Sequence, residues 1–553
     1  MKKIFSIIFV FTLFGAAAQE EEPTGEIEDA QIVIEKDKPL TLPKASRSYS
    51  KTEVLPVKTE QVAINYRLSA PVFNPEPIEV VPRQKPFSSS FDYESYNNYA
   101  ALGFGNYISP LVQAFLSKSE QDQEIGLWLN HESFINGPVR KKESAFATTD
   151  VSLFGNFDLR NALFKPELTF DRKSFHYYGY DNIAADLFAG ILPNITDKTH
   201  FNSFSLNPEL ISSNKNGLNY FIKPQIRYGW LGTSDASFNS EFDFNHQMGI
   251  GFEINDRFTG YVNAGYQFIG YKSSFSNNRN IAKITPGVNF EFEKFKGKIG
   301  VELAGANDST ESAMKFYVFP DISGQFVFND QLSLNLLVDG GVIGTSLRNS
   351  FDNCWFLEDS LSMKNQIQKI NTEFSLAYAI NSKLSVEPYL GISSTNQKSL
   401  FVVSSSDSSR FALTYDEGDF IQTDMGARIV FTGKSASVSV DMKFSNYKTA
   451  EVTEPWYLPA SQLEINYNQT FIEKLNVSAS LLLMDGITGM SPVSENAVTL
   501  GSILDLGLSA QYEINEQWGA FIQGRNLLNQ SYERYLNYPV IGLNGKLGFI
   551  YRF

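Results

Sequence analysis

The sequence predicts an all-β protein: a single transmembrane antiparallel β-barrel of about 20–22 strands, preceded by an extended, proline-rich segment. Three observations support this prediction. Apolar and polar residues alternate with a period of two over many stretches. Short polar turns recur between these stretches. After the first residues, no stretch approaches the ~18–20 consecutive apolar residues that a transmembrane helix needs.

The first residues have the pattern of a secretory signal peptide. Lys2 and Lys3 precede a largely apolar run at residues 4–14, and Ala16 and Ala18 have the A-x-A spacing of a cleavage site. We expect cleavage after about Ala18 and export of the mature chain. Because no cysteine follows this site, we expect no lipid anchor there.

Residues 19–96 are acidic and rich in proline, as in "PVFNPEPIEVVPRQKPF". Such a composition does not form a hydrophobic core, so we expect an extended periplasmic segment. Two interpretations of the segment are open: it tethers a periplasmic partner or reaches the cell wall, or it is a linker without a role of its own.

The overall composition excludes several classes of protein. The chain has a single cysteine, Cys354, so no internal disulfide framework is possible. A formal net charge of −15 argues against a nucleic-acid partner. Aromatic residues make up 14% of the chain although its mean hydropathy is only −0.20, as expected where apolar and polar residues alternate.

Residues 97–553 contain the predicted strands. In "SILDLGLSAQYEI", Leu504, Leu506 and Leu508 alternate with polar or small residues, and "SASVSVDMKF" has the same pattern. We predict tight turns at Asn255-Asp256, near Lys294, and at Asn329-Asp330, Asn381-Ser382, Thr432-Gly433, Glu473-Lys474 and Asn515-Glu516. A spacing of about 35–52 residues accommodates two long strands and one longer loop, which is the arrangement of an outer-membrane barrel.

The last residues, "GKLGFIYRF", predict the closing strand. Phe549, Tyr551 and Phe553 share one side and are expected to face lipid near the membrane interface, whereas Lys546 and Arg552 are expected to face a wet lumen. Because an open sheet edge in hydrocarbon leaves backbone groups unpaired, this strand must pair with the first one, near "YAALGFGNY".

The carboxyl-terminal region resembles the end of TonB-dependent receptor barrels. The resemblance rests on "GRNLLNQSYE", with Gly524, Arg525, Asn526, Leu527, Leu528, Asn529 and Tyr532 in the penultimate strand and its exit. The terminal Phe553, with Phe549 and Tyr551, resembles an insertion signal read by the barrel-assembly machinery. The resemblance implies a barrel of 22 strands in the outer membrane of a Gram-negative bacterium.

The chain also departs from that family. A plug domain of well over a hundred residues is expected ahead of such a barrel, with segments of the type V-x-V-R-G and V-L-I-D-G, and neither occurs here. "QIVIEKDK" is at best a loose match to a TonB box. Engagement of TonB and energised uptake therefore remain open.

No pattern of catalytic, metal-binding or cofactor-binding residues is present. The four histidines, His131, His176, His200 and His246, form no H-E-x-x-H motif, and with one cysteine they offer no metal-ligand spacing. We expect no enzyme activity and no cofactor. "DEGD" at residues 416–419 is either a calcium site or a solvated loop. "DGGVIGTS" at residues 339–346 is not expected at a strand-to-helix junction, so we predict no phosphate loop there.

Two functions remain open. The first is transport or binding of a solute across the outer membrane, and the second is a scaffold or subunit of a larger envelope complex, with residues 19–96 tethering a partner. An unplugged barrel of this size would be a wide hole, so its lumen must be filled. The candidates are inward-folded loops such as residues 346–366, the amino-terminal segment, or a partner protein. The other expected partners are outer-membrane lipid and the barrel-assembly machinery.

Overall fold

The computed structural model describes residues 98–120, 122–179, 198–212, 218–233, 237–308, 311–492 and 494–553. The predicted signal peptide and the predicted segment at residues 19–96 lie outside these residues. The first strand begins at Tyr99, two residues after the predicted start of the barrel.

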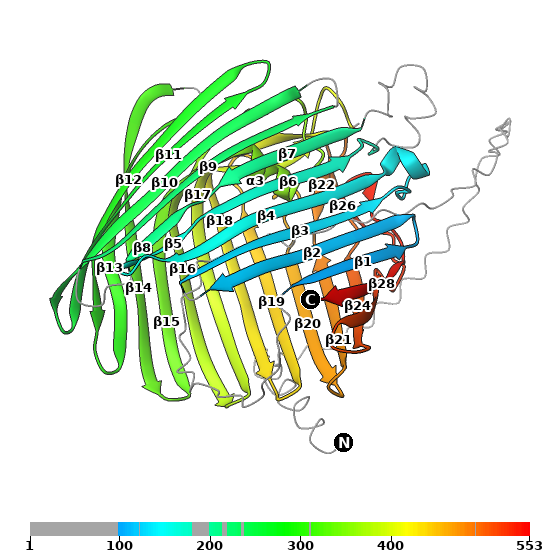
Figure 1. The fold of residues 1–553 in the computed structure, drawn as a ribbon. Helices are drawn as coiled ribbons and strands as arrows, with labels where there is room; N and C mark the ends of the chain where they lie inside the picture. Colours follow the sequence, from blue (N-terminus) through cyan, green and yellow to red (C-terminus); the bar gives the residue numbers. More distant parts are fainter. Residues whose placement is uncertain are drawn as a thin grey trace, which may run out of the picture. The chain divides into compact units, whose positions relative to one another are not determined.

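The described residues form one closed antiparallel barrel (Figure 1). Its sheet has 24 segments, of which β5 and β6 are two parts of one strand, as are β7 and β8, so the barrel has 22 strands. This confirms the predicted fold class. The segments are β1 (Tyr99–Gly105), β2 (Ser109–Glu120), β3 (Gln123–Phe134), β4 (Phe146–Asp158), β5 (Ala162–Lys165), β6 (Glu167–Phe175), β7 (Thr199–Leu206), β8 (Glu209–Ser212), β9 (Asn219–Gly232), β10 (Ser237–Asn255), β11 (Phe258–Lys272), β12 (Ser276–Glu291), β13 (Phe295–Asp308), β14 (Glu311–Asn329), β15 (Leu332–Gly344), β16 (Asn365–Asn381), β17 (Leu384–Val403), β18 (Phe411–Thr432), β19 (Ala436–Lys448), β20 (Ser461–Phe471), β21 (Leu475–Asp485), β24 (Ile503–Glu513), β25 (Trp518–Arg525) and β28 (Asn544–Arg552).

Prolines account for the two interrupted strands. Pro166 separates β5 from β6, and Pro208 lies between β7 and β8. A proline has no backbone N–H to donate to a neighbouring strand, so the ladder is broken at these positions.

The barrel closes where the sequence predicts. β28 pairs with β1 in antiparallel register, with Phe549 opposite Leu102 and Tyr551 opposite Ala100. The Phe553 N–H also donates to the Asn98 carbonyl at 3.1 Å. Closure leaves no unpaired sheet edge to face the membrane.

One end of the barrel carries short turns, and all seven predicted turns lie there. Four of them share one device: the side-chain oxygen of an asparagine accepts the backbone N–H groups two and three residues later. These asparagines are Asn255, Asn329, Asn381 and Asn515. Asparagine favours turns because it makes such local bonds. We call this end the turn end; in outer-membrane barrels the short turns are periplasmic.

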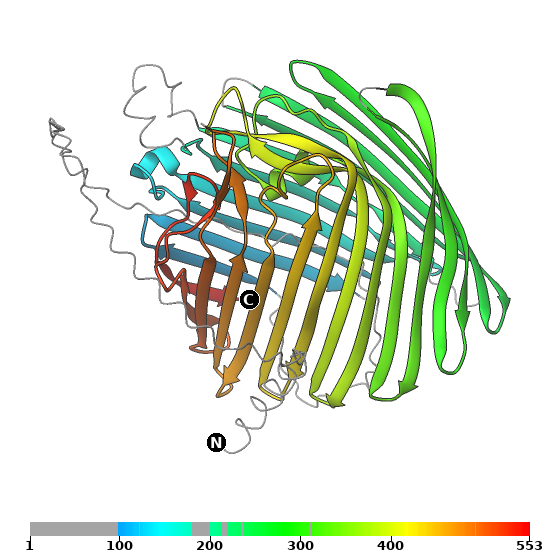
Figure 2. The ribbon, with the colours of Figure 1, turned by 180° about the vertical axis from the view of Figure 1, so that it is seen from behind.

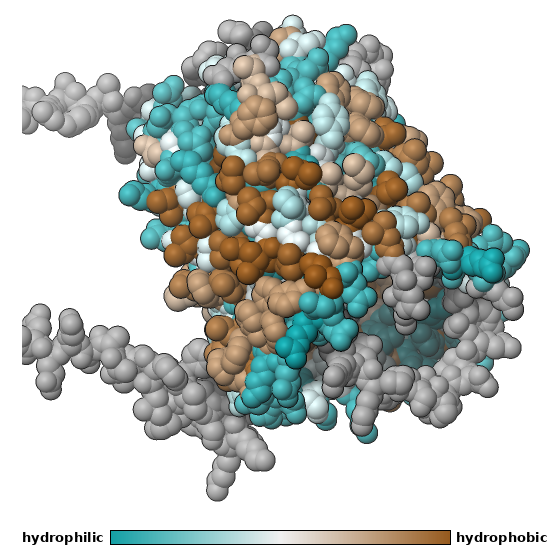
Figure 3. All heavy atoms as spheres, turned by 90° about the vertical axis from the view of Figure 1, so that its left-hand side faces the viewer, coloured by the Kyte–Doolittle hydropathy of each residue, from teal (hydrophilic) through white to brown (hydrophobic). Residues whose placement is uncertain are grey.

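The wall of the barrel has an apolar exterior and a polar interior. In β19, Val438, Met442 and Phe444 alternate with residues that face the lumen, such as Asp441. In β28, Leu547 and Phe549 are 63% and 56% exposed on the outside. Figure 3 shows the resulting band of hydrophobic residues between hydrophilic zones. Such a surface is suited to the hydrocarbon of a bilayer.

The opposite end, which we call the loop end, carries the longer connections. They contain the 3-10 helix η1 (Lys141–Ser144), the helix α3 (Leu347–Asn353) and two small hairpins. The hairpins are β22 (Thr488–Met490) with β23 (Ala497–Thr499), and β26 (Glu533–Tyr535) with β27 (Tyr538–Pro539). In the part of the chain that the structure describes, no helix is long and apolar enough to cross a membrane.

Candidate functional site

The lumen near the turn end is lined by charged side chains in partly exposed ion pairs. Arg428 on β18 lies 3.1 Å from Glu373 on β16 and 3.6 Å from Glu387 on β17. Its guanidinium also lies 4.3 Å from the ring centroid of Tyr389. Asp441 on β19 is 4.0 Å away, so one cation serves three carboxylates. This side of the lumen therefore carries excess negative charge.

A second network lies on the neighbouring arc of the wall. Lys298 on β13 is 2.6 Å from Asp321 on β14, and the Tyr261 hydroxyl donates to the same carboxylate at 2.8 Å. Asp339 of β15 lies opposite Asp321 in the same ladder, so this network also has more carboxylates than cations. The two arcs give the lumen a polar surface with no chemistry beyond hydrogen bonding and ion pairing.

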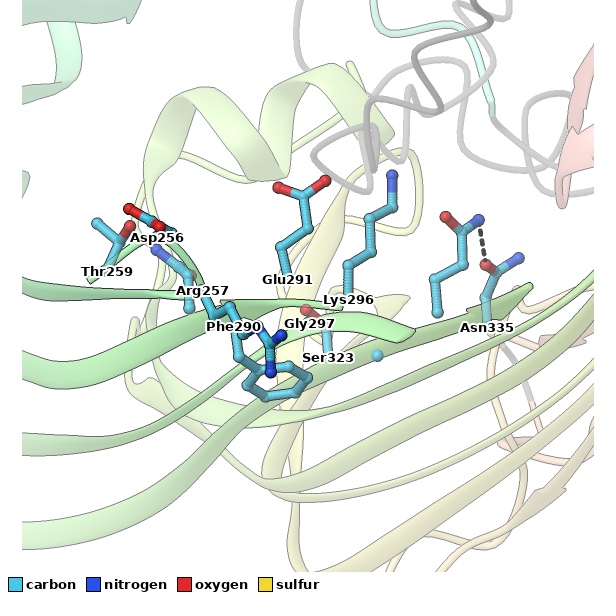
Figure 4. A pocket seen from close by; sticks show the side chains of 12 residues that line it. Asp256, Arg257, Thr259, Phe290, Glu291, Lys296, Gly297, Ser323 and Asn335 are labelled. Carbon is cyan, nitrogen blue, oxygen red and sulfur yellow. Dashed lines mark hydrogen bonds between the residues drawn. The ribbon is translucent and has the colours of Figure 1, made fainter. Parts of the chain in front are cut away.

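A shallow recess of about 310 Å³ lies in this second arc, close to the turns (Figure 4). Glu291 and Lys296 stand side by side and point the same way, and Gln325 donates to Asn335 at 2.9 Å. The lining residues are Asp256, Arg257, Thr259, Asn289, Phe290, Glu291, Lys296, Gly297, Ser323, Gly324, Gln325 and Asn335. Charges of both signs suit a small polar solute and do not select one.

Near the loop end the lumen is filled by the chain's own residues 345–364, which we call the inward loop. It leaves β15, forms α3 and returns to β16, and α3 lies inside the ring of strands (Figure 2). Two buried charges hold its start. The Arg279 guanidinium on β12 donates to the Thr345 carbonyl at 2.6 Å, and Glu241 on β10 accepts the Leu347 N–H at 2.7 Å.

This arrangement corrects one prediction. "DGGVIGTS" does lie at a strand-to-helix junction, because β15 ends at Gly344 and α3 begins at Leu347. The helix N-terminus is nevertheless occupied: Ser346 is the N-cap and accepts the Asn349 N–H, and Glu241 supplies the carboxylate. With this end filled, no phosphate loop is formed.

Ion pairs attach α3 to the wall of β6. Arg348 lies 2.6 Å from Asp171 and 2.8 Å from Asp352, and Lys173 lies 2.7 Å from Asp352. Burial raises the pKa of Asp352, but the charges of Lys173 and Arg348 outweigh it and hold that pKa below its usual range. Asp352 is therefore ionised at neutral pH and connects two cations.

Aromatic residues from several loops pack around the inward loop. We call this assembly the cap: residues 345–364 with residues 176–179, 449–460, 486–502 and 526–543. Phe351 is fully buried and stacks on Phe201 of β7 with 4.1 Å between ring centroids. Phe356 stacks on Tyr538 at 3.6 Å. The cluster is as buried as a globular core.

Tyrosine hydroxyls form hydrogen bonds with backbone N–H and carbonyl groups of the inward loop. Tyr177 donates to the Leu357 carbonyl at 2.7 Å and Tyr535 to the Asn353 carbonyl at 2.6 Å. The hydroxyls of Tyr271 and Tyr415 accept the N–H groups of Leu361 and Lys364 at 3.0 and 2.9 Å. A buried loop needs such partners for its polar groups, so the cap is a folded unit.

Cys354 lies within this cluster and is 1% exposed. Burial raises the pKa of its thiol well above the usual range. A thiol in this state is neither a nucleophile nor a metal ligand at neutral pH.

The residues of the carboxyl-terminal motif build the last loop of the cap. Gly524 and Arg525 end β25. The Arg525 guanidinium lies 3.1 Å from the carboxylate of Glu132 on β3. Asn526 has a left-handed backbone, and its amide donates to the carbonyls of Gln530 and Ile541 at 2.9 Å. The Tyr532 hydroxyl donates to Asp505 at 2.7 Å. The remaining motif residues, Leu527, Leu528 and Asn529, form the turn between them.

The terminal aromatic residues lie on the outside of the barrel, as predicted. Tyr551 is 4.8 Å from Trp518 and 5.6 Å from Phe553 between ring centroids. Lys546 faces the lumen side as predicted, but the prediction of a wet environment is wrong, because the side chain is buried against Glu132 and the ring of Phe134. The role of Phe549, Tyr551 and Phe553 as an insertion signal stays a prediction.

Most of the other candidate residues have hydrogen-bond partners, whereas His246 stacks on Phe244 and its buried Nδ1 makes no hydrogen bond to any residue that the structure describes. His131 bonds to Thr149 and His200 to Ser174, each at 2.8 Å. In "DEGD", Asp416 accepts the N–H groups of Ala450 and Glu451 at 2.8 and 2.6 Å, so it organises a loop. Within the described ranges, no group of three or more histidine, cysteine or acidic side chains is placed to hold a metal ion.

Sequence reasoning missed the residues that hold the inward loop, such as Glu241, Arg279 and Tyr177. Glu241 and Arg279 are charged residues inside predicted strands, and the sequence alone does not distinguish them from other residues that face the lumen. A charged residue close to the loop end of a strand is the only sequence signal they carry, and it does not name a partner.

The closed barrel, the apolar exterior and the polar lumen together define an integral outer-membrane β-barrel protein. No protein-family model and no curated protein sequence matches the chain. The structural comparisons are more informative, because the fold is that of TonB-dependent receptor barrels.

Three solved structures illustrate the likeness. The FrpB iron transporter from Neisseria meningitidis matches with a TM-score of 0.63 and 8% identity, over 82% of this chain and 81% of that one. The ferric-catecholate import receptor Fiu from E. coli gives 0.60 and 8%, over 83% and 82%. FpvA from P. aeruginosa, solved with a bound pyoverdine–iron complex, gives 0.59 and 10%, over 82% and 71%.

Proposed function

We propose that the protein transports or binds a solute at the outer membrane, and that the inward loop is the outer gate of its lumen. The observation that carries this proposal is a lumen lined by polar side chains near the turn end, with a recess of about 310 Å³, that ends at a folded loop near the loop end. Its similarity to iron and ferric-siderophore transporters supports a transport role and does not identify the solute.

The attachment of the gate is compatible with opening. α3 is joined to the wall by two ion pairs, Arg348 with Asp171 and Asp352 with Lys173. A charged solute or a partner is able to replace these pairs. Residues 345–364 connect neighbouring strands, so the loop is able to leave the lumen without breaking the barrel ladder.

A second candidate is a scaffold in an envelope complex, with residues 19–96 tethering a periplasmic partner. The depth of the cap favours it, because Phe351, Phe356 and Tyr538 would all have to leave buried sites before a solute entered from outside. In this proposal the lumen is accessible from the periplasm alone.

Deletion of the gene separates the two candidates. Transport predicts that growth fails only on particular sources of a nutrient, with iron complexes tested first, and that a shortened chain lacking residues 39–90, which keeps "QIVIEKDK", restores it. Scaffolding predicts a defect on all media, which the shortened chain does not restore although its barrel inserts normally. The mass of the natively purified particle gives an independent reading, because a scaffold brings a stoichiometric partner with it.

A further inference from the structure

The outside of β6 and β7 changes from apolar to polar at one register. Phe170 lies opposite Phe204, and two residues nearer the loop end Arg172 lies opposite Asn202. On β4 the same change occurs from Val151 to Thr149, whereas on β9 Tyr228 is followed by Trp230, an aromatic residue of the kind found at membrane interfaces. This register is therefore the outer boundary of the hydrophobic band on this sector of the barrel.

Two exposed cations lie just beyond that boundary. Arg172 and Lys198 are both exposed, and Lys198 continues the outward-facing series of His200 and Asn202 on β7. Within the described residues, neither Arg172 nor Lys198 has an ion-pair partner. Partial burial and the neighbouring charge of Arg172 lower the pKa of the Lys198 ammonium, as expected of adjacent cations without an anion.

The lumen side of the same strands differs. Lys173, next to Arg172 in sequence, pairs with Asp352 at 2.7 Å, and Asp171 pairs with Arg348 at 2.6 Å. Cations that face inward are thus neutralised within the protein, whereas those that face outward are not. An anion from the surroundings is therefore able to pair with the two outward-facing cations.

We propose that Arg172 and Lys198 bind a phosphate group of an outer-leaflet glycolipid, whose acyl chains lie along Phe170, Phe204 and Tyr228. The site is amphipathic in the order that such a lipid requires, with cations on the side of the loop end and aromatic rings on the side of the membrane centre. Phe204 and Tyr228 are 43% and 46% exposed, so an acyl chain has surface to cover. Arginine is suited to the phosphate because it donates two parallel hydrogen bonds. This inference does not depend on the proposed function.

The test uses the full-length protein in phosphatidylcholine nanodiscs that contain diphosphoryl lipid A. Lipid A that stays with the protein after repurification is counted by native mass spectrometry. We expect stoichiometric retention by the wild type. We expect about fivefold weaker retention for each charge removed, since a basic residue near an anionic membrane surface contributes a factor of about that size. The R172Q/K198Q variant removes both charges and should lose both contributions.

The matched control is K118Q/K294Q, which removes the same number of charges at the turn end. Lys118 lies on the outer side of β2 with a side chain 82% exposed, so both variants should assemble equally. Retention by this control should equal that of the wild type. Equal retention by R172Q/K198Q, or equal retention of dephosphorylated lipid A, would overturn the proposal. Displacement of lipid A by inorganic phosphate at an equal concentration would also overturn it, because the site would then bind free phosphate.

Discussion

The two halves of the lumen are built from the same strands and differ in nearly everything else. Near the turn end, the side chains of Arg428 and Glu373 are each 34% exposed and their ion pairs remain wet. Near the loop end, Arg279 is fully buried and Phe351 is part of a packed cluster. Since the strand pattern is the same in both halves, the difference comes from the loops. The strands form the wall of the lumen, and the loops determine whether the lumen is filled.

The strongest test of this comparison removes the inward loop. Replacing residues 347–361 with a short Gly-Ser linker should convert a closed barrel into an open one, because these residues fill the loop-end half. In planar bilayers we expect a conductance at least as large as that of a porin of about 16–18 strands, against a nearly silent wild type. As a control, excision of residues 494–496, which are exposed between β22 and β23, should leave the barrel closed. An excised protein that remains silent would show that something else closes the lumen.

The next largest effect concerns assembly of the wall. Removal of Phe553 should lower the amount of heat-modifiable barrel in the membrane several-fold, because we expect the terminal aromatic residue to be read during insertion. Phe553 is 48% exposed and gives the folded barrel one backbone hydrogen bond, so its removal should hardly change stability after refolding in detergent. The F553Y variant should assemble normally. Unchanged assembly without Phe553 would contradict the insertion-signal prediction.

The two halves also differ in how far the sequence predicted them. The wall follows from local rules: the period of two fixes which side of β19 or β28 is apolar, and asparagine side chains close the turns at Asn255 and Asn515. The cap depends on contacts between distant positions, such as Arg348 with Asp171, which are 177 residues apart. A single sequence carries no periodic signal for such pairs. The same limit explains why the strand-to-helix junction after Gly344 was missed.

A smaller effect concerns the ion pairs that hold α3. The pKa of Asp352 is held below its usual range, so ionised Asp352 stabilises the cap above the unfolded-state pKa of about 3.9. This stabilisation is lost as the pH falls through the lower, folded-state pKa. Because the side chain is 39% exposed, we expect D352N to weaken the cap by about 1 kcal/mol at pH 7.

Hydrogen exchange of residues 347–363 is a direct measure of this effect. In the wild type, protection should decline on the acid side of pH 4, while D352N starts lower and changes less over the same range. The D330N variant, in a turn at the other end, should follow the wild type. A decline that is equally steep in D352N would assign the acid sensitivity to another group.

The smallest effect is expected in the wet half of the lumen. R428Q removes the cation that pairs with Glu373, Glu387 and Asp441. Since these pairs are partly exposed, stability should change by less than about 1 kcal/mol. The loss of one positive charge beside these carboxylates should nevertheless attract cations into the lumen. In the protein without residues 347–361, the reversal potential in a KCl gradient should therefore shift toward the potassium potential, whereas S480A, a neutral change on the lumen side of β21, should leave it in place. An unchanged potential in R428Q would mean that this arc does not line the conducting path, and that the two halves of the lumen are not one continuous passage.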